Sequence, residues 1–192
     1  MRYREGTDDD LVRAIAEGDP AAFSELMQRH RRWVFNLLST ITHDREQAED
    51  LTQEVFTRVH RHAGCYRGQG QFPAWLKKIA VNLARSYLTR QKQAPLLSLS
   101  TLEVELAQDE RFDPMMAFLS KGLQEEIRAA IASLPDEQRL AVIMRYFGGM
   151  SIQDIAWAMQ CAEGTIKSRI FHGLRSVRAI VTGAGKRGRD RR

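Results

Sequence analysis

Basic side chains gather in one short segment near the C-terminus, residues 164–178, "GTIKSRIFHGLRSVR". Ammonium and guanidinium groups bind phosphate, and they also donate hydrogen bonds to the edges of guanine bases. On a helical wheel, one apolar sector is shared by Ile166, Ile170, Leu174 and Val177. The segment therefore predicts an amphipathic helix that is buried on its apolar side and able to bind a polyanion with the other.

This helix is expected at residues 163–181 and follows a shorter one expected at 151–159, with "QCAE" between them. The spacing is typical of a helix-turn-helix, in which the second helix enters the DNA major groove. Lys and Arg can contact phosphate or guanine, and an exposed Phe can pack on a thymine methyl group. The alternative is a solvated helix face that binds nothing, but the short helix, the tight turn and the basic helix together favour duplex DNA. The candidate contact residues are Lys167, Ser168, Phe171, His172 and Arg175.

A second basic region occupies the middle of the N-terminal half, where no Asp or Glu occurs between Val55 and Leu102. Aromatic residues are interleaved with its cations, and this combination suits unstacked bases whose backbone is held by positive charge. We interpret Trp75 and Tyr87 as core residues, so Tyr66 in a Gly-rich loop is the better candidate for base stacking. The candidate residues for single-stranded or melted DNA are Tyr66, Arg67, Lys78, Asn82, Arg85 and Ser86.

A third cluster has the opposite charge and lies on the helix expected at residues 44–62. Carboxylates accept paired hydrogen bonds from guanidinium groups, so this face predicts a protein partner with exposed arginines. A merely solubilising helix face is the alternative. We call this cluster the acidic ridge, and it consists of Glu49, Asp50, Gln53 and Glu54.

Metal binding and catalysis have weaker support. His60, His62 and Cys65 match no usual zinc spacing, and no fourth ligand lies nearby in the sequence. No nucleophile and base pair, phosphate-binding glycine loop or pair of catalytic carboxylates stands out. We therefore predict no catalytic residue, no metal, no cofactor and no small-molecule substrate.

The elements that carry these residues are all expected to be helices. Apolar residues recur at three- and four-residue steps along most of the 192-residue chain, and no convincing alternating strand pattern occurs. The N-terminal half predicts a short helix in residues 7–20, a long one from about Phe23 to Ile41, one over 44–62 and one from about Pro73. Further helices are expected near residues 115–132, 136–147, 151–159 and 163–181.

The fold class predicted is all-α, with two small helical domains. The domains are expected at residues 1–92 and 115–182, with a flexible acidic linker at 93–114 and a disordered basic tail at 183–192. The net charge of +5 suggests a polyanionic partner. The two distant cysteines and the lack of a signal peptide or membrane-spanning run predict a soluble, cytoplasmic protein with no direct membrane insertion.

Two blocks of the sequence resemble the extracytoplasmic-function sigma factors, the small two-domain promoter-specificity subunits of bacterial RNA polymerase. The blocks are "QAEDLTQEVFTRVHRHAGCYRGQGQFPAWLKKIAVNLARSYLTRQ" and "LPDEQRLAVIMRYFGGMSIQDIAWAMQCAEGTIKSRIFHGLRSVR". The resemblance covers nearly the whole chain apart from the linker and tail. It implies a bundle like sigma region two followed by a helix-turn-helix like sigma region four.

The resemblance also implies partners and roles. The acidic ridge would dock on the clamp helices of the largest subunit of core RNA polymerase. The Tyr66 loop and the Asn82 face would bind the melted −10 promoter element, and the basic C-terminal helix would read the −35 element as duplex. An anti-sigma factor would control the protein and could hold it at the membrane. The linker would thread the polymerase channels.

The sequence departs from many relatives at Gln69, Gln160 and His172, which leaves the promoter sequence open. A helix-turn-helix regulator that acts without polymerase is the main alternative. It accounts for the C-terminal helices but leaves the acidic ridge and the aromatic loop without a role.

Overall fold

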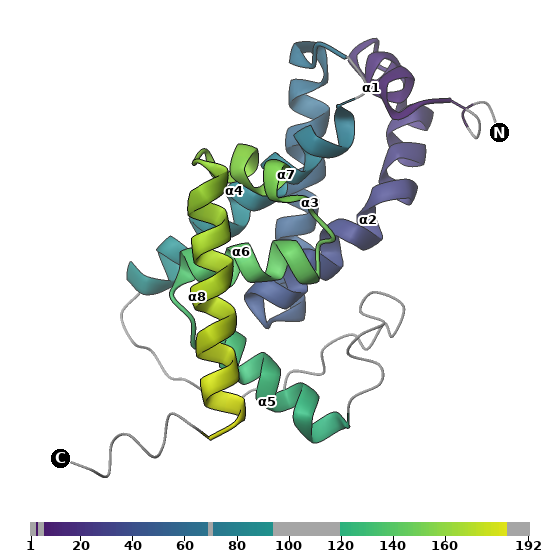
Figure 1. Ribbon diagram of the computed structural model, residues 1–192. Helices are drawn as coiled ribbons and strands as arrows, with labels where there is room; N and C mark the ends of the chain where they lie inside the picture. The colour runs from purple at the N-terminus through teal and green to yellow at the C-terminus, as the bar shows by residue number, and fades with distance from the viewer. Residues whose placement is uncertain (1–2, 4–5, 69–70, 94–119, 184–192) are drawn as a thin grey trace. The chain divides into compact units, whose positions relative to one another are not determined.

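The chain divides into two compact units, Met1–Leu106 and Ala107–Arg192. The computed structural model describes residues 3, 6–68, 71–93 and 120–183 (Figure 1). Across these residues the regular elements are helices, so the all-α prediction is confirmed. Apart from Gln93, the predicted linker lies outside the described residues, as does the tail beyond Gly183. None of the helices in these ranges is long and apolar enough to cross a membrane.

The N-terminal unit is a helical bundle in which α2 packs against α1, α3 and α4. A single turn of 3-10 helix, η1, continues from the end of α3 and leads into the loop that contains Tyr66. This turn is not predicted by the periodicity. The elements are α1 (Asp8–Ala16), α2 (Pro20–Thr42), α3 (Arg45–His62), η1 (Ala63–Cys65) and α4 (Phe72–Gln93).

Capping residues set the starts of the first three helices. Thr7 forms a capping box with Asp10, which satisfies backbone N–H groups at the start of α1. Asp19 accepts hydrogen bonds from the first turn of α2, where Pro20 occupies the first position. Asp44 accepts from the backbone of α3 in the same way. Asp19 and Pro20, predicted to end the first helix, instead begin α2, which starts three residues before the predicted Phe23.

The core of the N-terminal unit is built from the apolar stripes of its helices. A fully buried side chain of this size contributes about 1.5–3 kcal/mol relative to exposure, so these contacts dominate the packing. The largest side chains buried here are Leu11, Leu26, Leu37, Leu38, Ile41, Phe56, Phe72 and Leu76.

The C-terminal unit is a second helical cluster in which α8 packs against α5, α6 and α7 (Figure 1). The observed α5 begins at Lys121, after an extended residue at Ser120; residues 115–119 of the predicted helix lie outside the described ranges. The largest fully buried side chains are Leu140, Ile143, Met144 and Met150. The helices are α5 (Lys121–Ala132), α6 (Asp136–Tyr146), α7 (Ile152–Met159) and α8 (Glu163–Val181).

The buried side of α8 differs from the predicted stripe at Leu174 and at Val177, which is only partly buried. Ile166 and Ile170 are buried as expected, but the Leu174 side chain is 38% exposed and Gly173 is buried in its place. A Cβ atom on Gly173 would lie 2.8 Å from Cγ2 of Val142 on α6. The two helices therefore approach each other closely at Gly173, and the backbone of α8 itself fills the space that a side chain would need.

Gly173→Ala is expected to destabilise the C-terminal unit. Overpacking against the stiff Val142 side chain costs about 1–3 kcal/mol, and the better helix propensity of Ala returns at most about 1 kcal/mol. Gly122→Ala in α5 is the matched control, because nothing lies within 4 Å of its added Cβ, and it should be neutral or stabilising. Thermal unfolding followed by circular dichroism measures both; a Gly173→Ala protein as stable as wild type contradicts the close approach.

Candidate functional site

The helix-turn-helix consists of α7, a tight turn and α8. Ser151 and Asp154 form a capping box that starts α7. The helix ends at Gln160, whose φ of 54° is left-handed, a conformation that usually favours glycine. The two helices pack against each other, and Ala156 of α7 and Ile166 of α8 are both buried. The departure at Gln160 therefore leaves the turn geometry intact.

The outward face of α8 carries all of the residues predicted to contact duplex DNA. Each of them is exposed, and Phe171 is 62% exposed although it is a large apolar residue. The Phe171 ring meets the His172 ring edge to face at 5.4 Å. Arg169, by contrast, is turned inward, where it pairs with Glu137 of α6 at 3.0 Å. The exposed set is Lys167, Ser168, Phe171, His172 and Arg175.

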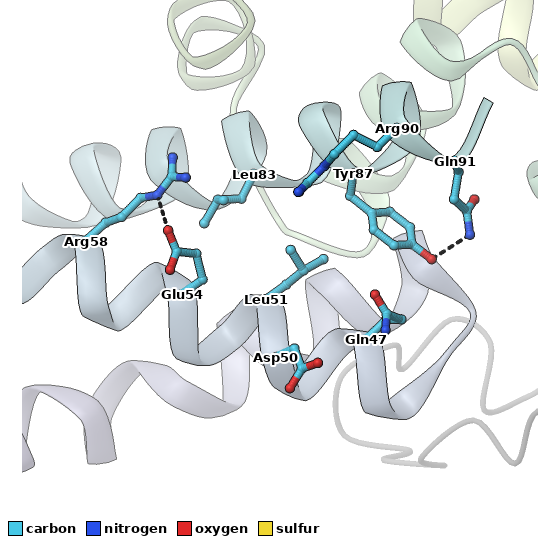
Figure 2. Close-up of a pocket in the computed structure, with 9 residues that line it drawn as sticks. All are labelled: Gln47, Asp50, Leu51, Glu54, Arg58, Leu83, Tyr87, Arg90 and Gln91. Atoms are coloured by element: carbon cyan, nitrogen blue, oxygen red, sulfur yellow. Dashed lines mark hydrogen bonds and ion pairs between the residues drawn. The ribbon is translucent and has the colours of Figure 1, made fainter. Parts of the chain in front are cut away.

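The acidic ridge lies along α3, beside an open pocket of about 580 Å³ between α3 and α4. Figure 2 shows Asp50 and Glu54 one helical turn apart on α3, with Leu83 and Tyr87 of α4 across the pocket. Leu51 forms the apolar floor between the two helices. The pocket is large enough to admit a side chain of a partner next to the ridge.

The carboxylates of the ridge differ in their local pairing. Glu54 is paired with Arg58 at 2.7 Å, and Glu49 with Arg45 at 3.3 Å, both within α3. Asp50 is exposed. Because exposed pairs of this spacing stabilise a helix by only about 0.3–0.5 kcal/mol, an external arginine can displace Arg58 at small cost.

The loop after η1 presents Tyr66 beside a group of aromatic rings. The Tyr66 ring lies 5.1 Å from the Trp75 ring and 6.1 Å from the Phe72 ring. The Tyr66 hydroxyl donates to Oδ1 of Asp9 in α1 at 2.7 Å. Burial, together with that hydrogen bond, raises the pKa of the Tyr66 hydroxyl, so the group stays a protonated donor. Arg67, the next residue, is exposed.

The predicted face of α4 is continuous with this loop through Trp75. Trp75, Lys78 and Asn82 are spaced by three and four residues and so share one side of the helix. Arg85 and Ser86 follow one turn later. The interpretation of Trp75 as a core residue is wrong, because its side chain is only partly buried, whereas Tyr87 is 8% exposed and belongs to the core. Trp75 thus joins the aromatic surface next to Tyr66.

The possible metal ligands do not form a centre. Among the residues with described positions, no group of three or more His, Cys, Asp and Glu side chains is arranged to hold a metal ion. His60 instead packs its ring against Phe23 at 5.2 Å.

Two segments of the chain match known family models. Residues 26–94 match the model of Sigma-70 region 2. Residues 124–177 match the model of Sigma-70, region 4. The first match contains the acidic ridge, the Tyr66 loop and α4, and the second contains α7, the turn and α8 as far as residue 177.

Curated relatives match over nearly their whole length. The chain is 33% identical over 177 residues to the ECF RNA polymerase sigma-E factor of Escherichia coli strain K12, covering 89% of this chain and 92% of that protein. It is 31% identical over 176 residues to the RNA polymerase sigma-H factor of Pseudomonas aeruginosa strain PAO1, covering 88% and 91%.

Solved structures share the fold. CnrH, in complex with the cytosolic domain of CnrY, matches with a TM-score of 0.65 and 16% identity over 92% of this chain and 97% of that one. The sigma factor RpoE from Bartonella quintana, in complex with the anti-sigma factor NepR, matches with a TM-score of 0.66 and 21% identity over 83% and 96%.

The two helical units define a sigma factor of the sigma-70 type, and the chain belongs to its extracytoplasmic-function family. It is an alternative sigma factor, a transcription initiation factor that binds core RNA polymerase and directs it to promoter DNA.

Proposed function

We propose that three surfaces of the chain bind different partners. They belong to a region-two domain at residues 1–92 and a region-four domain at 115–182. The acidic ridge docks on the clamp helices of the polymerase's largest subunit. The observation that carries the proposal is the distribution of carboxylates within the N-terminal unit: the acidic ridge, Glu49, Asp50, Gln53 and Glu54, lies on α3, whereas α4 and the loop before it carry cations and no Asp or Glu. The carboxylates of the ridge repel DNA phosphates and accept hydrogen bonds from arginine side chains.

The two cationic surfaces contact different forms of the promoter. The exposed face of α8 binds the −35 element as duplex, through phosphates and a few base edges. The Tyr66 loop and the α4 face with Lys78, Asn82, Arg85 and Ser86 bind the melted −10 element, where an aromatic ring next to cations can stack an unpaired base. Arg67 contacts the backbone of the same strand. The polymerase fixes the spacing of the two domains and so removes the cost of ordering them.

Control by an anti-sigma factor is part of the proposal. Two of the solved structures that share the fold are complexes, one of the sigma factor RpoE with the anti-sigma factor NepR and one of CnrH with the cytosolic domain of CnrY. A partner that covers the acidic ridge or α8 would prevent polymerase or promoter binding. Because polymerase and DNA are the ligands, we place the protein in the bacterial cytoplasm, where an anti-sigma factor can hold it at the membrane. Catalysis of RNA synthesis belongs to the polymerase.

Reconstitution with core RNA polymerase tests the function. Transcripts that rise when the protein is overproduced define its promoters, and run-off transcription on those promoters measures initiation. We expect specific transcripts from core polymerase plus this protein and none from core polymerase alone. The free protein should bind the same promoters weakly. Tight promoter binding by the free protein, with no transcription in the reconstituted system, would indicate a regulator that acts without joining the polymerase.

A further inference from the structure

The first turn of α1 lies outside the residues matched by the region 2 model, which begins at residue 26. It contains three consecutive aspartates whose carboxylates have different partners. Asp10 caps the start of its own helix through Thr7. Asp8 and Asp9 instead contact other elements of the unit. Helix capping therefore accounts for only part of this acidic turn.

Asp9 reaches the loop that is proposed to bind melted DNA. Its Oδ1 accepts the hydrogen bond from the Tyr66 hydroxyl at 2.7 Å, across 57 residues of sequence. Its Oδ2 lies 3.8 Å from the position that a Cβ atom on Gly68 would take, and Gly68 has a left-handed φ of 77°. One carboxylate thus lies against the loop at two positions, and the exposed Arg67 lies between them.

Asp8 fixes the place of this turn on the rest of the bundle. Its carboxylate pairs with Arg29 at 3.3 Å and lies 2.8 Å from Nε2 of His30, both on α2. The His30 ring in turn packs on the buried Phe72 ring at 5.3 Å. Asp9 is therefore presented by an anchored helix turn, which gives its hydrogen bond to Tyr66 a defined position.

We propose that Asp9 is a positioning residue for promoter opening: through the Tyr66 hydroxyl it holds the aromatic loop in one shape, ready for an unstacked base. The inference rests on the proposed function of the Tyr66 loop. A carboxylate beside a DNA-binding loop repels phosphate, so its charge works against binding. Asp9 contributes instead by fixing the Tyr66 ring in advance, so that the ring does not have to be ordered when the DNA strand binds.

A double-mutant cycle in the reconstituted holoenzyme tests this coupling. The rate of open-complex formation is measured by permanganate reactivity of unpaired thymines on a promoter defined by the overproduction experiment. Asp9→Ala and Tyr66→Phe are each expected to slow opening about tenfold, the change that about 1.4 kcal/mol produces. The double variant should be no slower than either single one. Asp9→Asn, which keeps an acceptor oxygen, should open within about twofold of wild type.

Three results would overturn the inference: additive losses in the double variant, an Asp9→Asn protein as slow as Asp9→Ala, or faster opening by Asp9→Ala. Tyr66→Ala separates this inference from the function on which it rests. If Tyr66→Ala opens normally, the proposed role of the loop fails. If Tyr66→Ala is slow while Asp9→Ala opens like wild type, only the role of Asp9 fails. Glu17→Ala removes an exposed carboxylate at the other end of α1 and controls for charge.

Discussion

Charge reversal of Asp50 and Glu54 together should weaken association with core RNA polymerase by at least about 100-fold. Like charges placed opposite each other in an interface cost several kcal/mol, and each 1.4 kcal/mol is about tenfold in affinity. The two residues lie one turn apart beside the pocket between α3 and α4, so an arginine from the partner can meet both. Titration of fluorescently labelled protein with core polymerase measures the affinity.

Two controls separate a lost contact from a damaged helix. Glu17→Arg reverses an exposed charge elsewhere in the same unit and should bind polymerase like wild type. A swap of Glu54→Arg with Arg58→Glu keeps an oppositely charged pair within α3 but moves the carboxylate by a turn. If Glu54 meets an external arginine, the swap should stay defective. Wild-type affinity in the swap, or in the Asp50 and Glu54 double reversal, would contradict the assignment of the ridge.

The helices of the N-terminal unit could be predicted because their signals are local. Thr7, Asp19 and Asp44 are each followed within three residues by the backbone N–H groups that they cap, so the sequence alone contains both partners. The apolar stripe of α2 likewise repeats along one helix. Such features need no knowledge of what lies across the bundle.

Features that depend on a second element could not be predicted in this way. Gly173 is buried because α8 approaches Val142 of α6. The helical wheel instead placed Leu174 on the buried side. Trp75 appears apolar in the sequence, but it lies at the start of α4 beside Tyr66 and remains partly exposed. The acid run at α1 contains a recognisable cap, yet nothing in its spacing connects Asp9 to a tyrosine 57 residues away.

The same distinction applies to the candidate site. The exposed face of α8 follows from its own periodicity, and the structure exposes every residue predicted there. The surface formed by the Tyr66 loop and α4 could not be predicted without the tertiary structure, because it brings together a loop, a helix start and the first turn of α1. The charge of each surface could be predicted from the sequence, whereas the arrangement of the aromatic rings could not.

Removing both Lys167 and Arg175 should weaken the binding of holoenzyme to a duplex −35 element by about 30-fold or more. A well-placed cation contact to a base edge contributes about 1–3 kcal/mol, and these two exposed cations lie on the same side of α8. Fluorescence anisotropy with labelled promoter duplex measures this loss. If the cations contact phosphates, the slope of log affinity against log salt should also become shallower by about 1 for each lost contact.

The unit's own structure provides the controls for this prediction. Lys121→Ala removes an exposed cation from α5 and should change neither affinity nor salt slope. Phe171→Ala removes an exposed ring without changing charge, so it should reduce discrimination between promoter sequences and leave the slope unchanged. Polymerase association should be normal in the Lys167 and Arg175 variant, because the acidic ridge is on α3 in the other unit. Loss of polymerase and promoter binding together would contradict separate surfaces, and an unchanged promoter affinity would remove α8 from the duplex contact.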